Sequence, residues 1–110
     1  SIENTMKEIN ITLERLNELI DSLYEDKDTD VEFKLLQFQK LVYILQQLIE
    51  ITDYELNEEN GKYFVLDKIG DLINRLDNYK ADLLKKYGYD AYKRALFSYR
   101  SLLRLKQELK

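Results

Sequence analysis

The sequence predicts an all-α protein, an antiparallel up-down four-helix bundle with left-handed packing and short loops. Three observations favour this fold: apolar residues recur every three or four positions, proline is absent, and glycine occurs only three times. Proline ends helices and glycine shapes turns, so a chain poor in both is expected to form a few long helices. We therefore expect a single domain over residues 1–110, with helices at about 2–25, 30–53, 61–87 and 90–109.

The first predicted helix carries the most regular apolar pattern. Its apolar residues alternate steps of 4 and 3 positions and form a coiled-coil-like seam of Ile2, Met6, Ile9, Leu13, Leu16, Ile20 and Leu23. Such a seam drifts backward along a straight helix, which is typical of helices wound into a left-handed bundle. An acidic stretch interrupts the pattern at residues 25–30. Thr29 and Glu32 then stand at capping-box spacing, so a second helix is expected to begin near Asp30.

The second predicted helix has more apolar surface than one seam provides. Its seam consists of Val31, Leu35, Phe38, Val42, Leu45 and Ile49. Phe33, Ile44 and Ile51 lie farther round the helix and help to widen the apolar arc to about 200°. Two interpretations stay open: this flank faces the centre of the bundle, or it is free to bind a partner helix or a second copy of the chain.

The third and fourth predicted helices are joined by a very short hinge. The third is an ordinary one-sided amphipathic helix with an apolar arc of about 140°. Gly88 is expected at its left-handed C-terminal position, and Asp90 is expected to cap the fourth helix. Because the hinge is so short, these two helices are expected to run antiparallel. The four segments have similar lengths, as an up-down bundle requires.

Charge is distributed unevenly along the chain. Residues 1–60 carry 15 acidic and 5 basic side chains, whereas residues 61–110 carry 6 acidic and 12 basic ones. One explanation is that the basic fourth helix lies beside the acidic first helix, since up-down topology makes the two neighbours. The same imbalance would also let two chains associate head to tail.

A second explanation places some of the basic residues on an outward-facing surface. A helical wheel puts Lys93, Phe97, Arg100 and Arg104 opposite the apolar side of the fourth helix, with Arg94 toward the edge. An exposed aromatic ring among cations can hold an acidic partner protein, or it can stack on a base while the cations contact phosphates. The net charge of −4 and the lack of a recognised nucleic-acid motif disfavour nucleic acid.

This composition contains few residues suited to catalysis or to cofactor binding. The chain has no histidine and no cysteine, which removes the commonest general base, the commonest metal ligand and the thiolate nucleophile. The glycines are scattered, so no phosphate loop is formed, and no carboxylate lies on an apolar seam, where burial would shift its pKa. We therefore expect no enzymatic activity, no metal and no cofactor. The longest apolar run is five residues, LVYIL, and the first residues resemble no signal peptide, so we expect a cytoplasmic protein that does not span a membrane.

The sequence thus predicts a non-enzymatic protein–protein interaction module, such as an adaptor, an export chaperone, an inhibitor or a small assembly subunit. The candidate partner-binding residues are Lys93, Phe97, Arg100 and Arg104 on the fourth helix, and Phe33, Ile44 and Ile51 on the second. The partner would be an acidic protein or an amphipathic helix, and a homodimer is one form that this binding could take. The alternative is a small subunit of a larger assembly that contacts nucleic acid through its basic C-terminal helix.

Overall fold

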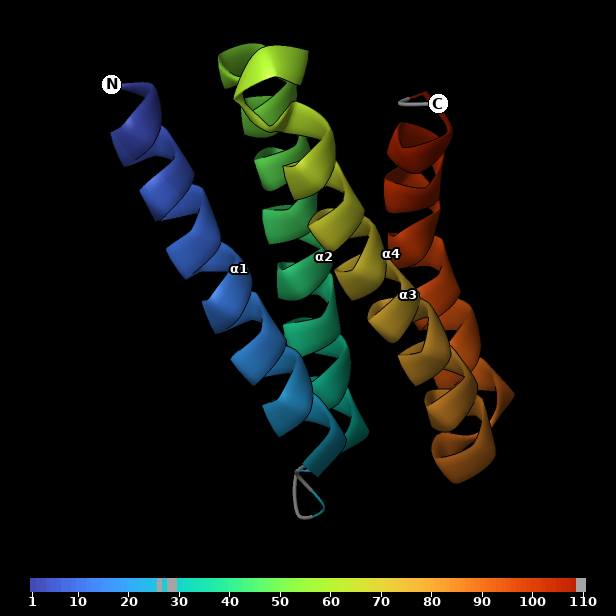
Figure 1. Ribbon diagram of the computed structural model, residues 1–110. Helices are drawn as coiled ribbons and strands as arrows, with labels where there is room; N and C mark the ends of the chain where they lie inside the picture. The colour runs from blue at the N-terminus through green and yellow to red at the C-terminus, as the bar shows by residue number, and fades with distance from the viewer. Residues whose placement is uncertain (26, 28–29, 109–110) are drawn as a thin grey trace.

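The computed structural model, which describes residues 1–25, 27 and 30–108, shows four long helices packed side by side (Figure 1). They are α1 (Ile2–Glu25), α2 (Val31–Glu55), α3 (Lys62–Tyr87) and α4 (Tyr89–Glu108), and a short 3-10 helix, η1 (Glu58–Asn60), connects α2 to α3. Successive helices run in opposite directions, so both ends of the chain lie at the same end of the bundle. The predicted all-α, antiparallel four-helix bundle is confirmed. The last residue of the fourth predicted helix, Leu109, lies outside the described residues.

Side-chain caps occur in the first two connections between helices. Asp30 is the N-cap of α2, where its Oδ1 accepts a hydrogen bond of 2.9 Å from the Phe33 amide. Thr29, which the capping-box spacing suggested, lies outside the described residues. In the next turn, Asn57 and Asn60 form a reciprocal capping box around η1. Gly61 follows in the left-handed region, with φ at +97°, and α3 begins at the next residue.

A single residue, Gly88, separates α3 from α4. Its φ of +94° agrees with the glycine expected there, but its ψ of −177° lies outside the left-handed helical region. The hinge is therefore tighter than predicted, and α4 already begins at Tyr89. The prediction that Asp90 caps this helix is wrong, because Asp90 lies inside the first turn. Its carboxylate still lies near the positive end of the helix dipole.

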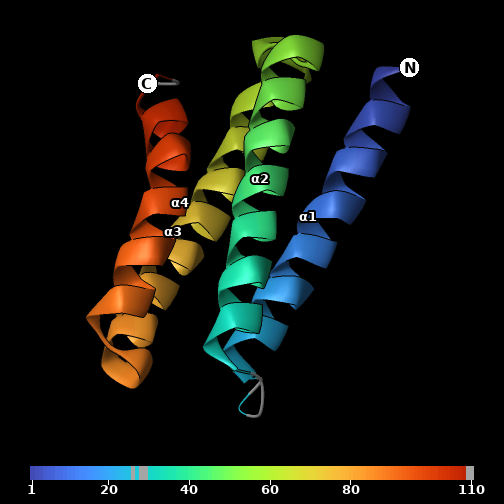
Figure 2. The same cartoon turned by 180° about the vertical axis from the view of Figure 1, so that it is seen from behind.

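The helices form a flattened bundle in which α2 and α3 lie between α1 and α4 (Figures 1 and 2). α1 packs against α2 and α3, and α4 packs against the same two helices from the other side. The Cα atoms extend over 45 × 26 × 16 Å. The expectation that the first and fourth helices are neighbours is therefore wrong. In this arrangement α2 and α3 each contact the other three long helices, a position that the wide apolar arc of α2 fits.

The ion pairs between helices follow this arrangement. Arg75 on α3 pairs with Asp21 on α1, with a nitrogen–oxygen distance of 2.5 Å. Arg94 on α4 pairs with Glu32 on α2, also at 2.5 Å. Instead of the predicted charge pairing between the first and fourth helices, these two pairs join α1 to α3 and α2 to α4, and a third, between Lys62 and Asp53 at 2.6 Å, joins α3 to α2. In each, an exposed or partly exposed pair selects the neighbour more than it stabilises the fold.

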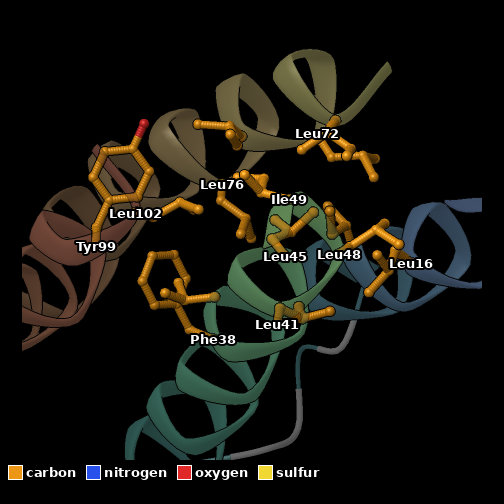
Figure 3. Close-up of a cluster of buried hydrophobic side chains, with 14 of the residues drawn as sticks. Leu16, Phe38, Leu41, Leu45, Leu48, Ile49, Leu72, Leu76, Tyr99 and Leu102 are labelled. Carbon is orange, nitrogen blue, oxygen red and sulfur yellow. The ribbon is translucent and has the colours of Figure 1, made fainter. Parts of the chain in front are cut away.

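A continuous hydrophobic core runs along the inner faces of all four helices (Figure 3). α2 contributes the largest labelled group, including Phe38, Leu45 and Ile49, and all three are almost fully buried. Tyr99 and Leu102 close the core from α4, and the α1 seam closes it from the other side from Ile9 onward, whereas Ile2 at the start of the predicted seam is exposed. Each such side chain contributes about 1.5–3 kcal/mol when fully buried, so this core is the main source of stability.

Candidate partner-binding surfaces

The two neighbours of α4 determine which of its faces is free. Toward α2, Arg94 binds Glu32; toward α3, the Tyr99 ring lies under the ammonium group of Lys80, 3.9 Å from its centroid. Ala95 and Leu102 point between these contacts into the core. The side of α4 that remains faces away from the rest of the molecule.

The predicted residues of the fourth helix lie on this free side. Lys93, Phe97, Arg100 and Arg104 are all exposed, and we call this surface the α4 stripe. Phe97 has 77% of its surface accessible, an unusually large fraction for a phenylalanine. The four side chains follow one another at spacings of 4, 3 and 4 residues, so they form one row along the helix.

The cations of the α4 stripe are available for a partner. Among the side chains that the structure describes, those of residues 1–25, 27, 30–105 and 107, no carboxylate forms an ion pair with Lys93, Arg100 or Arg104. Arg94, at the edge of the stripe, differs from them. Its guanidinium donates two hydrogen bonds, of 2.5 and 2.8 Å, to Glu32 and thereby holds the pKa of this carboxyl group below its ordinary value. Arg94 therefore contributes to the contact between α2 and α4.

The three residues of the apolar flank predicted on α2 differ in how exposed they are. Ile44 is half-buried and packs against the core. Phe33 and Ile51 remain 44% and 47% exposed, respectively. The interpretation as bundle centre thus fits Ile44, whereas the other two residues keep accessible apolar surface. The three residues do not form one uniformly exposed binding surface.

Leu36 is an apolar surface residue of α2 that sequence reasoning missed. It is exposed and lines a surface hollow of about 370 Å³ together with Phe33 and Arg94. This hollow lies along the seam between α2 and α4, where the Arg94–Glu32 pair forms part of its wall. On the helical wheel, Leu36 lies far from the apolar seam of α2, so only the position of α4 shows that a hollow forms beside it.

Two buried lysines were also missed. Lys34 on α2 and Lys80 on α3 are both less than a tenth exposed. The Lys80 ammonium group lies 2.9 Å from the Asp77 carboxylate, in addition to its contact with Tyr99. Burial raises the pKa of Tyr99 to about 12, and the negative charge of Asp77 adds to this effect. A periodic pattern of polar and apolar residues contains no sign of such a contact, because lysine is ordinarily a surface residue.

Among the residues that the structure describes, no three acidic side chains gather closely enough to hold a metal ion. None of the helices there combines the length and the apolar character needed to cross a bilayer. Comparisons of the chain with protein families, with curated proteins and with solved structures found no match. The α4 stripe is therefore the surface on which a functional argument can be built from geometry.

Proposed function

We propose that this protein is a non-enzymatic protein–protein interaction module that binds its partner through the α4 stripe. Adaptors, export chaperones, inhibitors and small assembly subunits all act by binding another protein. The observation that carries the proposal is the exposure of Phe97 within a row of cations that lack a described ion-pair partner. The absence of cysteine fits a reducing compartment, so we place this activity in the cytoplasm.

The composition of the α4 stripe resembles the energetic centre of many protein interfaces. Aromatic residues and arginine are enriched at such centres, where a few side chains supply most of the binding energy. Phe97 would insert into an apolar pocket of the partner, and Arg100 and Arg104 would pair with carboxylates around it. The same cations would raise the rate of association with an acidic protein. The preferred partner is accordingly an acidic protein surface with an apolar pocket.

A paired substitution tests this proposal. Phe97→Ala/Arg100→Ala should weaken partner binding by about tenfold or more, because each change removes a side chain of the kind that dominates interfaces. Its melting temperature should stay close to that of the wild type, since both residues are exposed. The matched control is Tyr54→Ala/Lys40→Ala, which removes an 87% exposed tyrosine and an exposed cation from α2. It should bind as the wild type does.

The measurement is affinity capture from cells that contain the protein, followed by titration of the captured partner. Proteins held by the wild type and the control, but lost by the α4 variant, would support the proposal. Equal capture by all three proteins would contradict it. If the captured material is instead destroyed by nuclease, and its affinity falls steeply with salt, the alternative of a nucleic-acid contacting subunit would replace the proposal.

A further inference from the structure

The outer face of α1 repeats the spacing of the α4 stripe with different charges. Lys7, Ile11, Glu14 and Glu18 follow one another at steps of 4, 3 and 4 residues, and all are exposed. We call this surface the α1 stripe. Ile11 has 54% of its surface accessible, so this row also contains an exposed apolar residue at its second position. Both stripes therefore have a cation, an apolar residue and then two charged residues of one sign.

The two stripes are complementary over three of their four positions. If they are aligned in parallel, Phe97 meets Ile11, Arg100 meets Glu14 and Arg104 meets Glu18. The last two contacts pair opposite charges that have no described ion-pair partner within the chain. At the first position Lys93 would meet Lys7, which are both cations. This single repulsive pair opposes two attractive pairs and one apolar contact, so the aligned stripes attract each other on balance.

The two stripes of one molecule cannot meet. α2 and α3 lie between α1 and α4, so the α1 stripe and the α4 stripe occupy opposite edges of the flattened bundle (Figures 1 and 2). The complementary surface must come from another molecule. We propose that the α4 stripe binds the α1 stripe of a second copy of this chain. This proposal rests on the proposed function and names one partner for the same surface, in which the exposed side chain of Ile11 takes the place of an apolar pocket.

Such a contact joins two different surfaces, so each bound molecule still offers one free stripe of each kind. Contacts of this type close into rings or continue as open chains. The contact area of two single helix faces is small compared with a stable interface, so the association is expected to be weak and concentration-dependent. Because charge pairs hold much of it together, it should weaken as salt is added.

Sedimentation of the purified protein at low salt measures this association. The average mass of the wild type should rise above 13.3 kDa as concentration increases, and it should return toward that value in high salt. Arg100→Glu/Arg104→Glu makes both edges acidic, and Glu14→Arg/Glu18→Arg makes both edges basic. Each variant alone should self-associate about tenfold or more weakly than the wild type. A mixture of the two variants should associate again, because opposite charges face each other at both kinds of contact.

Two comparisons make the outcome specific. Lys40→Glu/Lys85→Glu changes net charge by the same amount as Arg100→Glu/Arg104→Glu but reverses exposed cations outside both stripes, so it should associate as the wild type does. Phe97→Asp should abolish the association without lowering the melting temperature. The proposal is overturned if the wild type keeps the mass of one chain at every concentration in low salt, or if the mixed variants fail to restore association. The capture experiment with Phe97→Ala/Arg100→Ala would still decide the proposed function separately.

Discussion

Tyr99 titrates unusually because it is buried. The residue is 3% exposed, and burial, reinforced by the charge of Asp77, raises its pKa to about 12 from the ordinary 10.0. The neutral form is thus favoured in the folded state relative to the unfolded chain. The stability linked to this group is fully present below pH 10 and is lost as pH rises toward about 12.

Removal of the Tyr99 hydroxyl should make the protein less sensitive to alkali. Between pH 10 and about 12, the free energy of unfolding of the wild type should fall more steeply than that of Tyr99→Phe. Urea denaturation across this range measures the two slopes. Tyr54→Phe, which changes an exposed tyrosine, is the control and should follow the wild type. Parallel curves for the wild type and Tyr99→Phe would show that Tyr99 titrates normally.

The exposure of an individual side chain was predictable from the sequence where its position on the helical wheel alone decides it. The exposure of Phe97 follows from its position opposite Ala91, whatever surrounds the helix. The exposures of Phe33 and Ile51 depend on which helices flank α2, and the wheel carries no such information. The burial of Lys80 depends on the Tyr99 ring of another helix, so it could not be read from α3 alone.

The helices themselves were the most predictable level of this structure. Every predicted boundary within the described residues lies within two positions of the observed one, because the apolar period of a long helix outweighs local uncertainty. The least accurate end was that of α2, which continues to Glu55 beyond the predicted residue 53. Thr52 and Glu55 stand at capping-box spacing while a turn was also expected around Asn60 and Gly61, so the sequence offered two places for the break; in the structure Asn57 caps the following η1.

The same substitution should have opposite effects at two glycines of α3 and its C-terminal hinge. Gly70 lies inside α3, and a Cβ atom added there meets no other atom within 4 Å. Gly70→Ala should therefore raise the free energy of unfolding by about 0.5–1 kcal/mol, because alanine loses less backbone entropy in a helix. Gly88 has a φ of +94°, which an L-residue adopts with strain. Gly88→Ala should lower the free energy of unfolding by about 1 kcal/mol or more.

Chemical denaturation of both glycine variants measures this contrast. The double variant serves as the internal control, since distant sites are expected to add within about 0.5 kcal/mol. A stabilising Gly88→Ala would mean that the hinge relaxes to another backbone conformation. A destabilising Gly70→Ala would mean that the surroundings of this position are more crowded than the structure shows.

At the scale of the whole molecule, the arrangement of helices was the part that the sequence left open. An up-down order allows a square bundle, with the first and fourth helices in contact, and a flattened one, with the second and third between them. The apolar arc of about 200° on the second helix was compatible with neighbours on two sides and with a flank kept for a partner. The sequence alone did not decide between these two interpretations, because both leave the same apolar residues on the same helix.

The flattened arrangement predicts unequal local stability. α2 and α3 each contact every other long helix, whereas α1 is held from one side only. Amide hydrogen exchange should therefore be slowest in α2 and α3 and faster in α1. Arg75 joins α3 to α1 through Asn17 and Asp21, so Arg75→Ala should increase exchange in α1 by about tenfold. Exchange in α4 should change little. An equal increase of the exchange rate in α1 and in α4 would indicate that the bundle opens as one cooperative unit.

The separation of α1 from α4 also gives the molecule an electric dipole across its width. The acidic edge and the basic edge are held apart by two rigid helices, so neither edge neutralises the other. An anion-exchange matrix would meet the first edge and a cation-exchange matrix the second. How the protein adsorbs to a charged support is therefore governed by which edge turns toward it, and the net charge of −4 describes neither edge.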